Sequence, residues 1–185
     1  MKKILFLFLA ACFFFSCEKE TIVIPQQHAG RTVLAFFWAD NSLNSSLRDN
    51  IQTMMQGLQA MKDSAALLVY WDGEASDISW PEPCIVEYVT NGQGGINSLS
   101  KGTIDAMMAD KNTSIYDLIG IGNIRKKYPP QTSTEKTVMQ TVIGDMMSAY
   151  PSESYGIIFG SHGSGWLPTI TGTRSIGQDG GRYSS

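Results

Sequence analysis

Hydrophobic residues along the chain form short apolar runs that alternate with longer amphipathic segments. Residues 32–38 and 65–71 are apolar at almost every position, a pattern typical of strands buried on both faces of a sheet. Between them, hydrophobic residues recur at spacings of three and four from residue 43 to 61, which predicts a helix with one apolar face. This order predicts two parallel strands joined by a right-handed crossover. Residues 84–89 predict a further strand.

A second helix and strand follow in the later part of the chain. Residues 134–150 carry apolar side chains at helical spacing, and Pro151 stops the predicted helix. The apolar run 155–159 then predicts a buried strand, reached by a second crossover onto the parallel sheet. The strand leads into a glycine-rich turn with the sequence Gly-Ser-His-Gly-Ser-Gly-Trp at 160–166.

Two segments have a weaker pattern. Residues 115–119 and 124–128 fit either two short strands or one irregular helix. After Trp166 the chain turns polar and rich in glycine, so we expect a mobile segment that forms no element of its own.

Polar residues follow each predicted strand. Asp40, Asn41 and Ser42 offer side-chain acceptors for the first amides of the helix that begins near residue 43. Asp72 follows the second strand, where a carboxylate could bind a substrate or a cation. Turn formation together with Gly73 is the interpretation that the sequence favours.

His162 is the residue with the clearest chemical potential. The chain has two histidines, and His28 lies in a polar segment without catalytic neighbours. An isolated histidine is often structural, but the glycines at 160 and 163 let a substrate backbone approach, and the amide of Gly163 could face a developing oxyanion. The turn therefore favours a catalytic role.

The N-terminus has the features of a targeting segment. Lys2 and Lys3 precede an apolar run at 4–15, and Ser16 precedes Cys17. We expect a lipoprotein signal peptide at 1–16, lipidation of Cys17 and a tether at 17–30. The resulting location is the bacterial cell envelope, as a lipoprotein anchored in the outer membrane or at the cell surface. An ordinary signal peptide with an incidental cysteine is the alternative.

Composition excludes several classes of function. The formal charge of −3 and the pI near 5.3 provide no basic surface for nucleic acid. Once Cys17 is lipidated, Cys84 is the one cysteine left in the mature chain, so no intramolecular disulfide can form. The sequence contains no C-x-x-C or H-E-x-x-H motif for zinc. A single domain over 31–185 with a packed core is expected.

Three motifs carry a family resemblance: S-H-G-S-G-W at 161–166, R-T-V-L-A-F-F-W-A-D-N-S-L at 31–43 and Y-W-D-G at 70–73. In this order and spacing, the chain from Arg31 to about Asp179 resembles the clostripain-like cysteine peptidases. The resemblance implies an α/β fold, a caspase-like three-layer sandwich with a mostly parallel sheet. It also implies that the histidine ends one central strand and that the nucleophilic cysteine ends the next one.

The sequence departs from the family pattern in its cysteines. Cys12, Cys17 and Cys84 all precede His162, so the strand that should carry the nucleophile is not within these residues. Cys84 follows a proline at the start of a strand and is interpreted as a buried, inert thiol. We therefore expect a sheet that is incomplete at the C-terminus, with an unpaired edge and an apolar face that promote aggregation.

The implied activity is peptide-bond hydrolysis after arginine or lysine by a thiolate. His162 would polarise the cysteine or protonate the leaving amine, and the amide of Gly163 would stabilise the oxyanion. Arg174 is a candidate processing site, with a plain surface loop as the alternative. Calcium dependence is a feature of some family members, but no D-x-D-x-D-G loop is present, so no cofactor is identified.

The partners implied are protein or peptide substrates, a membrane lipid at Cys17, and a missing C-terminal half or second chain; alone, the chain should be inactive. One alternative is a non-catalytic surface lipoprotein that uses the same scaffold as a binding module. Another is a serine hydrolase, since H-G-S-G faintly resembles the oxyanion loop of some lipases. That interpretation ranks last because the chain has no G-x-S-x-G motif.

Overall fold

The computed structural model describes residues 29–62, 64–73, 82–162, 177–179 and 182–184. The predicted signal peptide and Cys17 lie outside these residues, and so do His28, Gly163 and Arg174. Within the described ranges, no helix has both the length and the apolar character that crossing a bilayer requires.

A five-stranded sheet forms the centre of the molecule, in the order β4-β3-β2-β1-β5. The strands, in chain order, are β1 (Ala29–Ala39), β2 (Ala65–Gly73), β3 (Cys84–Val89), β4 (Asn123–Lys127) and β5 (Ser152–Gly160). The central strand β1 pairs in parallel with both β2 and β5, whereas β3 and β4 run antiparallel to their neighbours. The apolar runs at 32–38 and 65–71 are therefore central parallel strands, as predicted.

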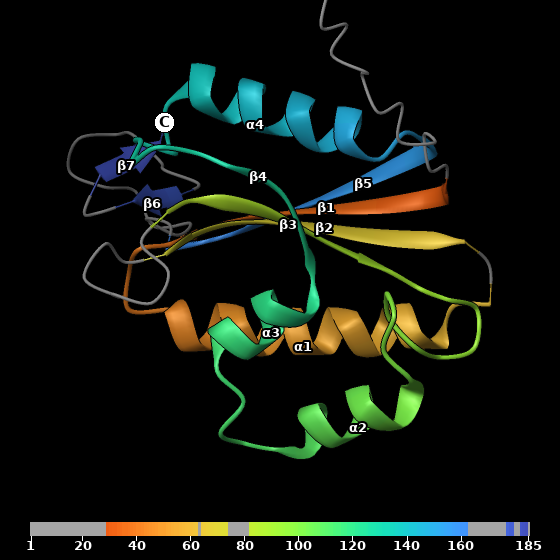
Figure 1. The fold of residues 1–185 in the computed structure, drawn as a ribbon. Helices are drawn as coiled ribbons and strands as arrows, with labels where there is room; N and C mark the ends of the chain where they lie inside the picture. Colours follow the sequence, from red (N-terminus) through yellow and green to blue (C-terminus); the bar gives the residue numbers. More distant parts are fainter. Residues whose placement is uncertain (1–28, 63, 74–81, 163–176, 180–181, 185) are drawn as a thin grey trace, which may run out of the picture.

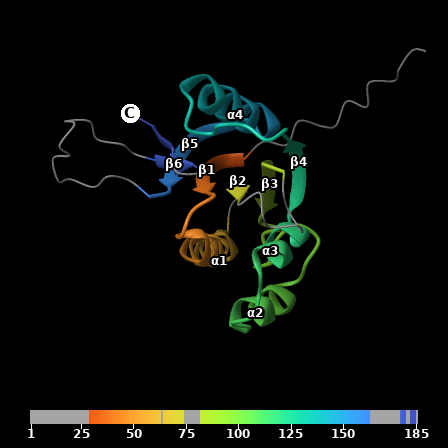
Figure 2. The ribbon, with the colours of Figure 1, turned by 90° about the vertical axis from the view of Figure 1, so that its left-hand side faces the viewer.

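Helices cover both faces of this sheet. Helix α1 (Asn44–Ala60) lies on one face with α2 (Lys101–Ala109) and α3 (Ile115–Ile121), and α4 (Lys136–Ala149) lies on the other (Figure 1 and Figure 2). The structure is thus the predicted three-layer α/β sandwich. Alternate side chains of β1 pack into the two cores, with Phe37 facing α1 and Trp38 facing α4.

The segment between β3 and α4 forms two helices and a strand. Each of the two alternatives for 115–128 holds for one half: residues 115–121 form the helix α3, because Ser114 and Asp117 close a capping box at its start. Residues 123–127 form the strand β4. Helix α2 was not predicted, although Ser100 accepts a hydrogen bond from the amide of Thr103 and marks its beginning.

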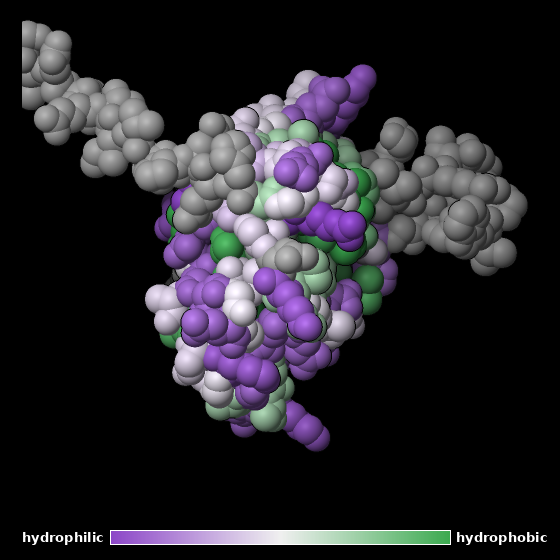
Figure 3. Space-filling view, turned by 90° about the vertical axis from the view of Figure 1, so that its right-hand side faces the viewer, coloured by the Kyte–Doolittle hydropathy of each residue, from purple (hydrophilic) through white to green (hydrophobic). Residues whose placement is uncertain are grey.

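Strand β5 is an edge strand in the part of the chain that the structure describes. The prediction of a buried strand was therefore wrong for its side chains: Ile157, Ile158 and Phe159 are 45%, 44% and 41% exposed. The expected unpaired edge with an apolar face is present instead. In the view of Figure 3, hydrophobic surface gathers along the border of the molecule on the β5 side.

Two short strands follow later in the chain. β6 (Gly177–Asp179) and β7 (Arg182–Ser184) pair in antiparallel fashion as a second, two-stranded sheet. The expectation that no element forms after Trp166 was wrong for these segments. Backbone pairing needs no apolar side chains, and the Gly180-Gly181 pair between them is a hairpin signal in the sequence.

Candidate active site

Parallel pairing of β1 and β5 brings two polar turns to one end of the sheet. Phe37 lies opposite Gly160, so β5 ends two residues before β1 at the same end of the sheet. The turn after β1 holds Asn41 and Ser42, and β5 continues into Ser161 and His162. Figure 2 looks onto this end of the sheet. The carboxyl ends of parallel strands are where open α/β sheets bind their ligands.

Side chains of the two turns are in direct contact. The Oγ of Ser42 lies 2.8 Å from Nε2 of His162, within hydrogen-bond distance. The Nδ2 of Asn41 lies 3.4 Å from Oγ of Ser161, a longer contact. The A-D-N-S motif and the S-H motif, 120 positions apart, therefore form one cluster.

The turn after β1 is fixed by its own amide side chains. Asn41 donates from Nδ2 to the carbonyl of Trp38 at 2.5 Å and accepts at Oδ1 from the amide of Leu43 at 2.9 Å. Asn44 donates to the carbonyl of Ala39 at 3.3 Å. These bonds hold Ser42 between β1 and the first turn of α1.

The predicted capping role is met only in part by Asn41 and not by Ser42. The N-cap position of α1 is Leu43, whose side chain caps nothing, and Asn41 accepts the amide of Leu43 one position before the helix begins. The prediction was wrong for Ser42, because its hydroxyl contacts an imidazole rather than a helix amide. Helical periodicity cannot reveal this contact, which depends on the strand order.

Gly160 allows β5 to lie close to β1 and α1 just before the histidine. A Cβ atom at this position would come within 2.6 Å of the Phe37 ring and 2.7 Å of Cδ2 of Leu47. Such distances are shorter than real Cβ atoms accept, so no larger residue fits without a shift of its neighbours. The glycine before Ser161 is thus a packing requirement of the site.

Asp72 differs from its prediction. Its side chain is 6% exposed inside β2 and accepts a hydrogen bond from the hydroxyl of Ser133, instead of forming a turn with Gly73. Ser133 also lies 2.6 Å from the hydroxyl of Tyr70, which accepts from Gln131 at 2.9 Å. This buried network joins β2 to the segment that leads into α4, and the carboxylate has a protein partner there.

Cys84 lies at the same end of the sheet as His162 because β3 runs antiparallel to β2. The thiol is fully buried, and β2 and β1 stand between β3 and β5. Three strand spacings correspond to about 14 Å, far beyond the reach of a proton transfer. Cys84 is therefore a buried core thiol, as predicted.

The other predicted site residues lie outside the described part of the chain. Gly163, Cys17 and Arg174 are in this group, so their placement stays a prediction. Among the residues that are described, no group of three histidine, cysteine, aspartate or glutamate side chains could hold a metal ion.

The sequence profile of the clostripain family matches residues 35–184, which include the second half of β1, the other four strands of the central sheet and both turns of the site. The chain belongs to the clostripain family. The resemblance drawn from the three motifs is thereby confirmed, and the fold is that of a clostripain-type cysteine peptidase.

Solved structures of clostripain-family proteins agree with this assignment. A cysteine protease of B. fragilis is 27% identical, with a TM-score of 0.53, and the match covers 78% of this chain and 98% of the other. A secreted C11 cysteine protease from Bacteroides thetaiotaomicron, solved with an irreversible peptide inhibitor, is 24% identical, with a TM-score of 0.54. A comparison with curated protein sequences found no match.

The solved relatives differ in length. The match to the secreted protease covers 85% of this chain but only 36% of the other chain. A clostripain from Bacteroides thetaiotaomicron, in complex with the peptide inhibitor BTN-VLTK-AOMK, is 16% identical with a TM-score of 0.52; the match covers 77% of this chain and 97% of the other. This chain thus spans nearly the whole of the B. fragilis protease chain and of the clostripain chain, but about a third of the secreted protease.

Proposed function

We propose that this chain is the N-terminal part of a lipid-anchored cysteine endopeptidase that cleaves after arginine or lysine. His162 is its acid–base residue, and the nucleophilic cysteine comes from a segment outside these 185 residues. The observation that carries the proposal is the position of His162: it follows a parallel strand at the carboxyl end of the sheet, beside an edge where another strand can pair.

In the proposed reaction, His162 transfers one proton from the cysteine thiol to the leaving amine. His162 takes the proton of the incoming thiol, and the thiolate attacks the carbonyl carbon of the scissile bond. The amide of Gly163 stabilises the oxyanion that forms. The imidazolium then returns its proton to the leaving amine as the C–N bond breaks, and water hydrolyses the thioester. The acid–base and oxyanion effects each contribute roughly two to four powers of ten in rate.

The two edges of the sheet are chemically different. The edge strand β4 carries Arg125, Lys126 and Lys127, and charged residues of this kind prevent pairing with another strand. The edge strand β5 has the sequence S-E-S-Y-G-I-I-F-G and exposes three large apolar side chains. A strand that pairs in parallel with β5 would end beside His162, which is where a nucleophile is needed.

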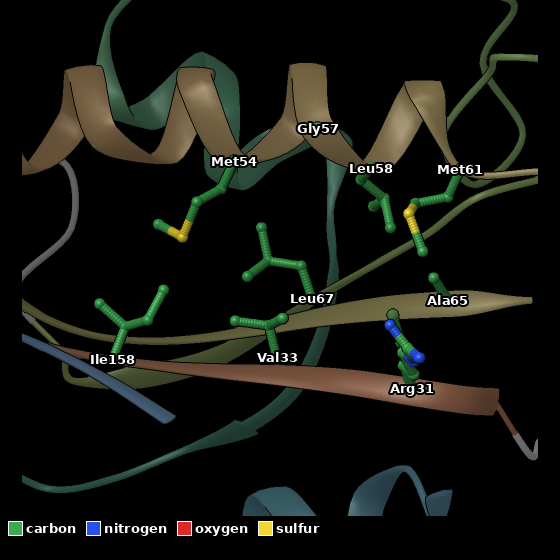
Figure 4. Close-up of a pocket in the computed structure, with 10 residues that line it drawn as sticks. Arg31, Val33, Met54, Gly57, Leu58, Met61, Ala65, Leu67 and Ile158 are labelled. Carbon is green, nitrogen blue, oxygen red and sulfur yellow. The ribbon is translucent and has the colours of Figure 1, made fainter. Parts of the chain in front are cut away.

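A groove beside β5 supports the same position for the missing segment. It has a volume of about 400 Å³ and lies between α1 and the sheet. In Figure 4, Met54, Leu58 and Met61 point from α1 towards Val33 and Ile158 on the sheet. Apolar side chains of an added element would fill this groove and bury Ile158.

Features of the relatives support the substrate class and the location. The peptide part of the inhibitor BTN-VLTK-AOMK ends in lysine, which agrees with cleavage after a basic residue. One relative is described as secreted, which agrees with export of this chain, and anchoring through Cys17 is proposed from the sequence alone. Arg174 is the proposed cleavage point for maturation.

The test is reconstitution. The chain is produced together with the coding region that follows it, and the assembly is treated with a biotinylated acyloxymethyl ketone that carries a C-terminal arginine or lysine. We expect covalent labelling of a cysteine in the downstream segment, and loss of labelling in His162→Ala. The matched control is His28→Ala, which should label like the wild type.

A second candidate function is a binding module without catalysis. It is favoured by the burial of Cys84, the one cysteine among the described residues. If the region downstream supplies no cysteine that reacts with the probe, the peptidase proposal is wrong and this alternative replaces it.

A further inference from the structure

Ser42 lies where a helix-capping serine is expected but contacts an imidazole. Its Oγ lies 2.8 Å from Nε2 of His162, while the helix begins after Leu43 without a side-chain cap. Serine at the start of a helix ordinarily accepts a hydrogen bond from a backbone amide two or three positions later. The contact between this hydroxyl and His162 therefore indicates a role for Ser42 in the site rather than in the helix.

We propose that Ser42 is the positioning residue of His162. Its hydroxyl accepts the Nε2–H of the ring and leaves the lone pair of Nδ1 as the one that exchanges protons with the reacting groups. The inference rests on the proposed function, because it assigns a role in orienting the acid–base residue of that reaction.

The support of Ser42 is rigid enough for this task. Asn41 is bonded on both sides of the turn, to the carbonyl of Trp38 at 2.5 Å and the amide of Leu43 at 2.9 Å. The same residue contacts Ser161, the neighbour of His162 in sequence, at 3.4 Å. The turn after β1 therefore meets the segment after β5 at two consecutive positions. A fixed turn keeps the hydroxyl in place while the ring changes its charge.

A hydroxyl suits a ring that changes its protonation state. Nε2 carries a hydrogen both in the imidazolium and in the neutral tautomer with a free Nδ1, and a serine oxygen accepts from it in both. The contact therefore persists while the proton on Nδ1 comes and goes. Because the hydroxyl is neutral, it orients the ring without adding a charge that would hold the proton.

The contact should affect catalysis more than folding. Ser42 is exposed, and water competes for an exposed hydrogen bond, so the net gain in stability is small. Orientation is different, because a misplaced acid–base group loses rate even when it remains bound nearby. We expect Ser42→Ala to lower kcat of the assembled peptidase about tenfold at unchanged KM.

The experiment measures the tautomer of His162 directly. The full chain is labelled with 15N-histidine, His28→Gln assigns the two rings, and long-range 1H–15N correlations are recorded at a pH where the imidazole is neutral. We expect the Nε2–H form alone in the wild type and a mixture with the Nδ1–H form, as in free histidine, in Ser42→Ala. Ser42→Thr keeps a hydroxyl and should behave like the wild type.

Ser46→Ala is the matched control, because it removes an exposed hydroxyl from the first turn of α1 without touching the site. It should leave the tautomer and kcat unchanged. The proposal is wrong if the wild type and Ser42→Ala have the same tautomer ratio, or if the wild type holds the Nδ1–H form. Either result leaves the peptidase proposal intact, whereas failure of reconstitution leaves the tautomer result standing.

Discussion

At the scale of single residues, the close approach of β5 to β1 and α1 depends on a glycine, which has no side chain. Gly160 lies against Phe37 and Leu47, and the next two residues reach the turn after β1. The positions of Ser161 and His162 are therefore set by packing just before them. A displacement of the β5 backbone at Gly160 should also displace His162, because only Ser161 separates the two residues.

A substitution at this glycine tests the dependence. Gly160→Ala should lower the free energy of unfolding by about 1–3 kcal/mol, since the new methyl group overpacks against Phe37 and Leu47. The matched control is Gly156→Ala in the same strand, where a Cβ meets nothing within 4 Å. Urea unfolding midpoints measure both variants. Equal midpoints would mean that β5 does not pack as closely as described.

At the scale of elements, an ion pair with a buried carboxylate connects β3 and β4, and its arginine reaches α4. Glu87 of β3 is 1% exposed, and its Oε2 lies 3.5 Å from Nε of Arg125 on β4. That distance gives an ion pair without a hydrogen bond at Oε2, and Asn123 donates to Oε1 at 3.3 Å. Arg125 also donates to the carbonyl of Ala149 at the end of α4. The pKa of Tyr150, beside this cluster, is raised mainly by burial of its side chain and to a lesser extent by the negative charge of Glu87.

Removal of Arg125 should lower the free energy of unfolding, because Glu87 is buried beside it. Arg125→Met leaves the carboxylate of Glu87 buried without its cation, and such an uncompensated charge costs about 3–5 kcal/mol of stability. On the same strand, Lys127 pairs with Glu82 at the surface, where an ion pair is worth about 0–1 kcal/mol. Lys127→Met is therefore the control. Chemical denaturation at neutral pH compares the two losses, and similar values would contradict the buried pair.

At the scale of the whole molecule, the sheet has one protected edge and, among the residues that the structure describes, one open edge. The charged strand β4 ends it on one side, and β5 with Ile157, Ile158 and Phe159 ends it on the other. An apolar edge without a covering element is a site for association between chains. The isolated chain should therefore associate through β5.

A charge on this edge should keep the chain monomeric. Ile158→Lys is expected to raise the concentration at which the isolated chain associates by about tenfold or more, since a lysine opposes strand addition at an edge. Ile124→Lys is the matched control, because Ile124 is 40% exposed on the opposite edge strand. Sedimentation velocity over a range of concentrations measures the difference. Association that both variants weaken equally would place the contact elsewhere.

Sequence patterns predicted the long strands and helices, because the spacing of their apolar residues determines which faces they bury. The runs of β1 and β2 are apolar at almost every position, and α1 and α4 carry regular apolar stripes. Short elements were less predictable: α3 forms because a capping box outweighs a strand-like composition at its start. The contact of Ser42 with His162 could not be predicted, since it depends on which strand lies beside β1.

The central place of β1 has a consequence for synthesis. Its partner on one side, β2, follows within one helix, but its partner on the other side, β5, is the last strand of the five-stranded sheet to leave the ribosome. One flank of β1 therefore stays open while most of the chain is made, and it must avoid premature pairing until β5 arrives. Only that late docking joins the two turns, so His162 reaches Ser42 after β5 has paired with β1.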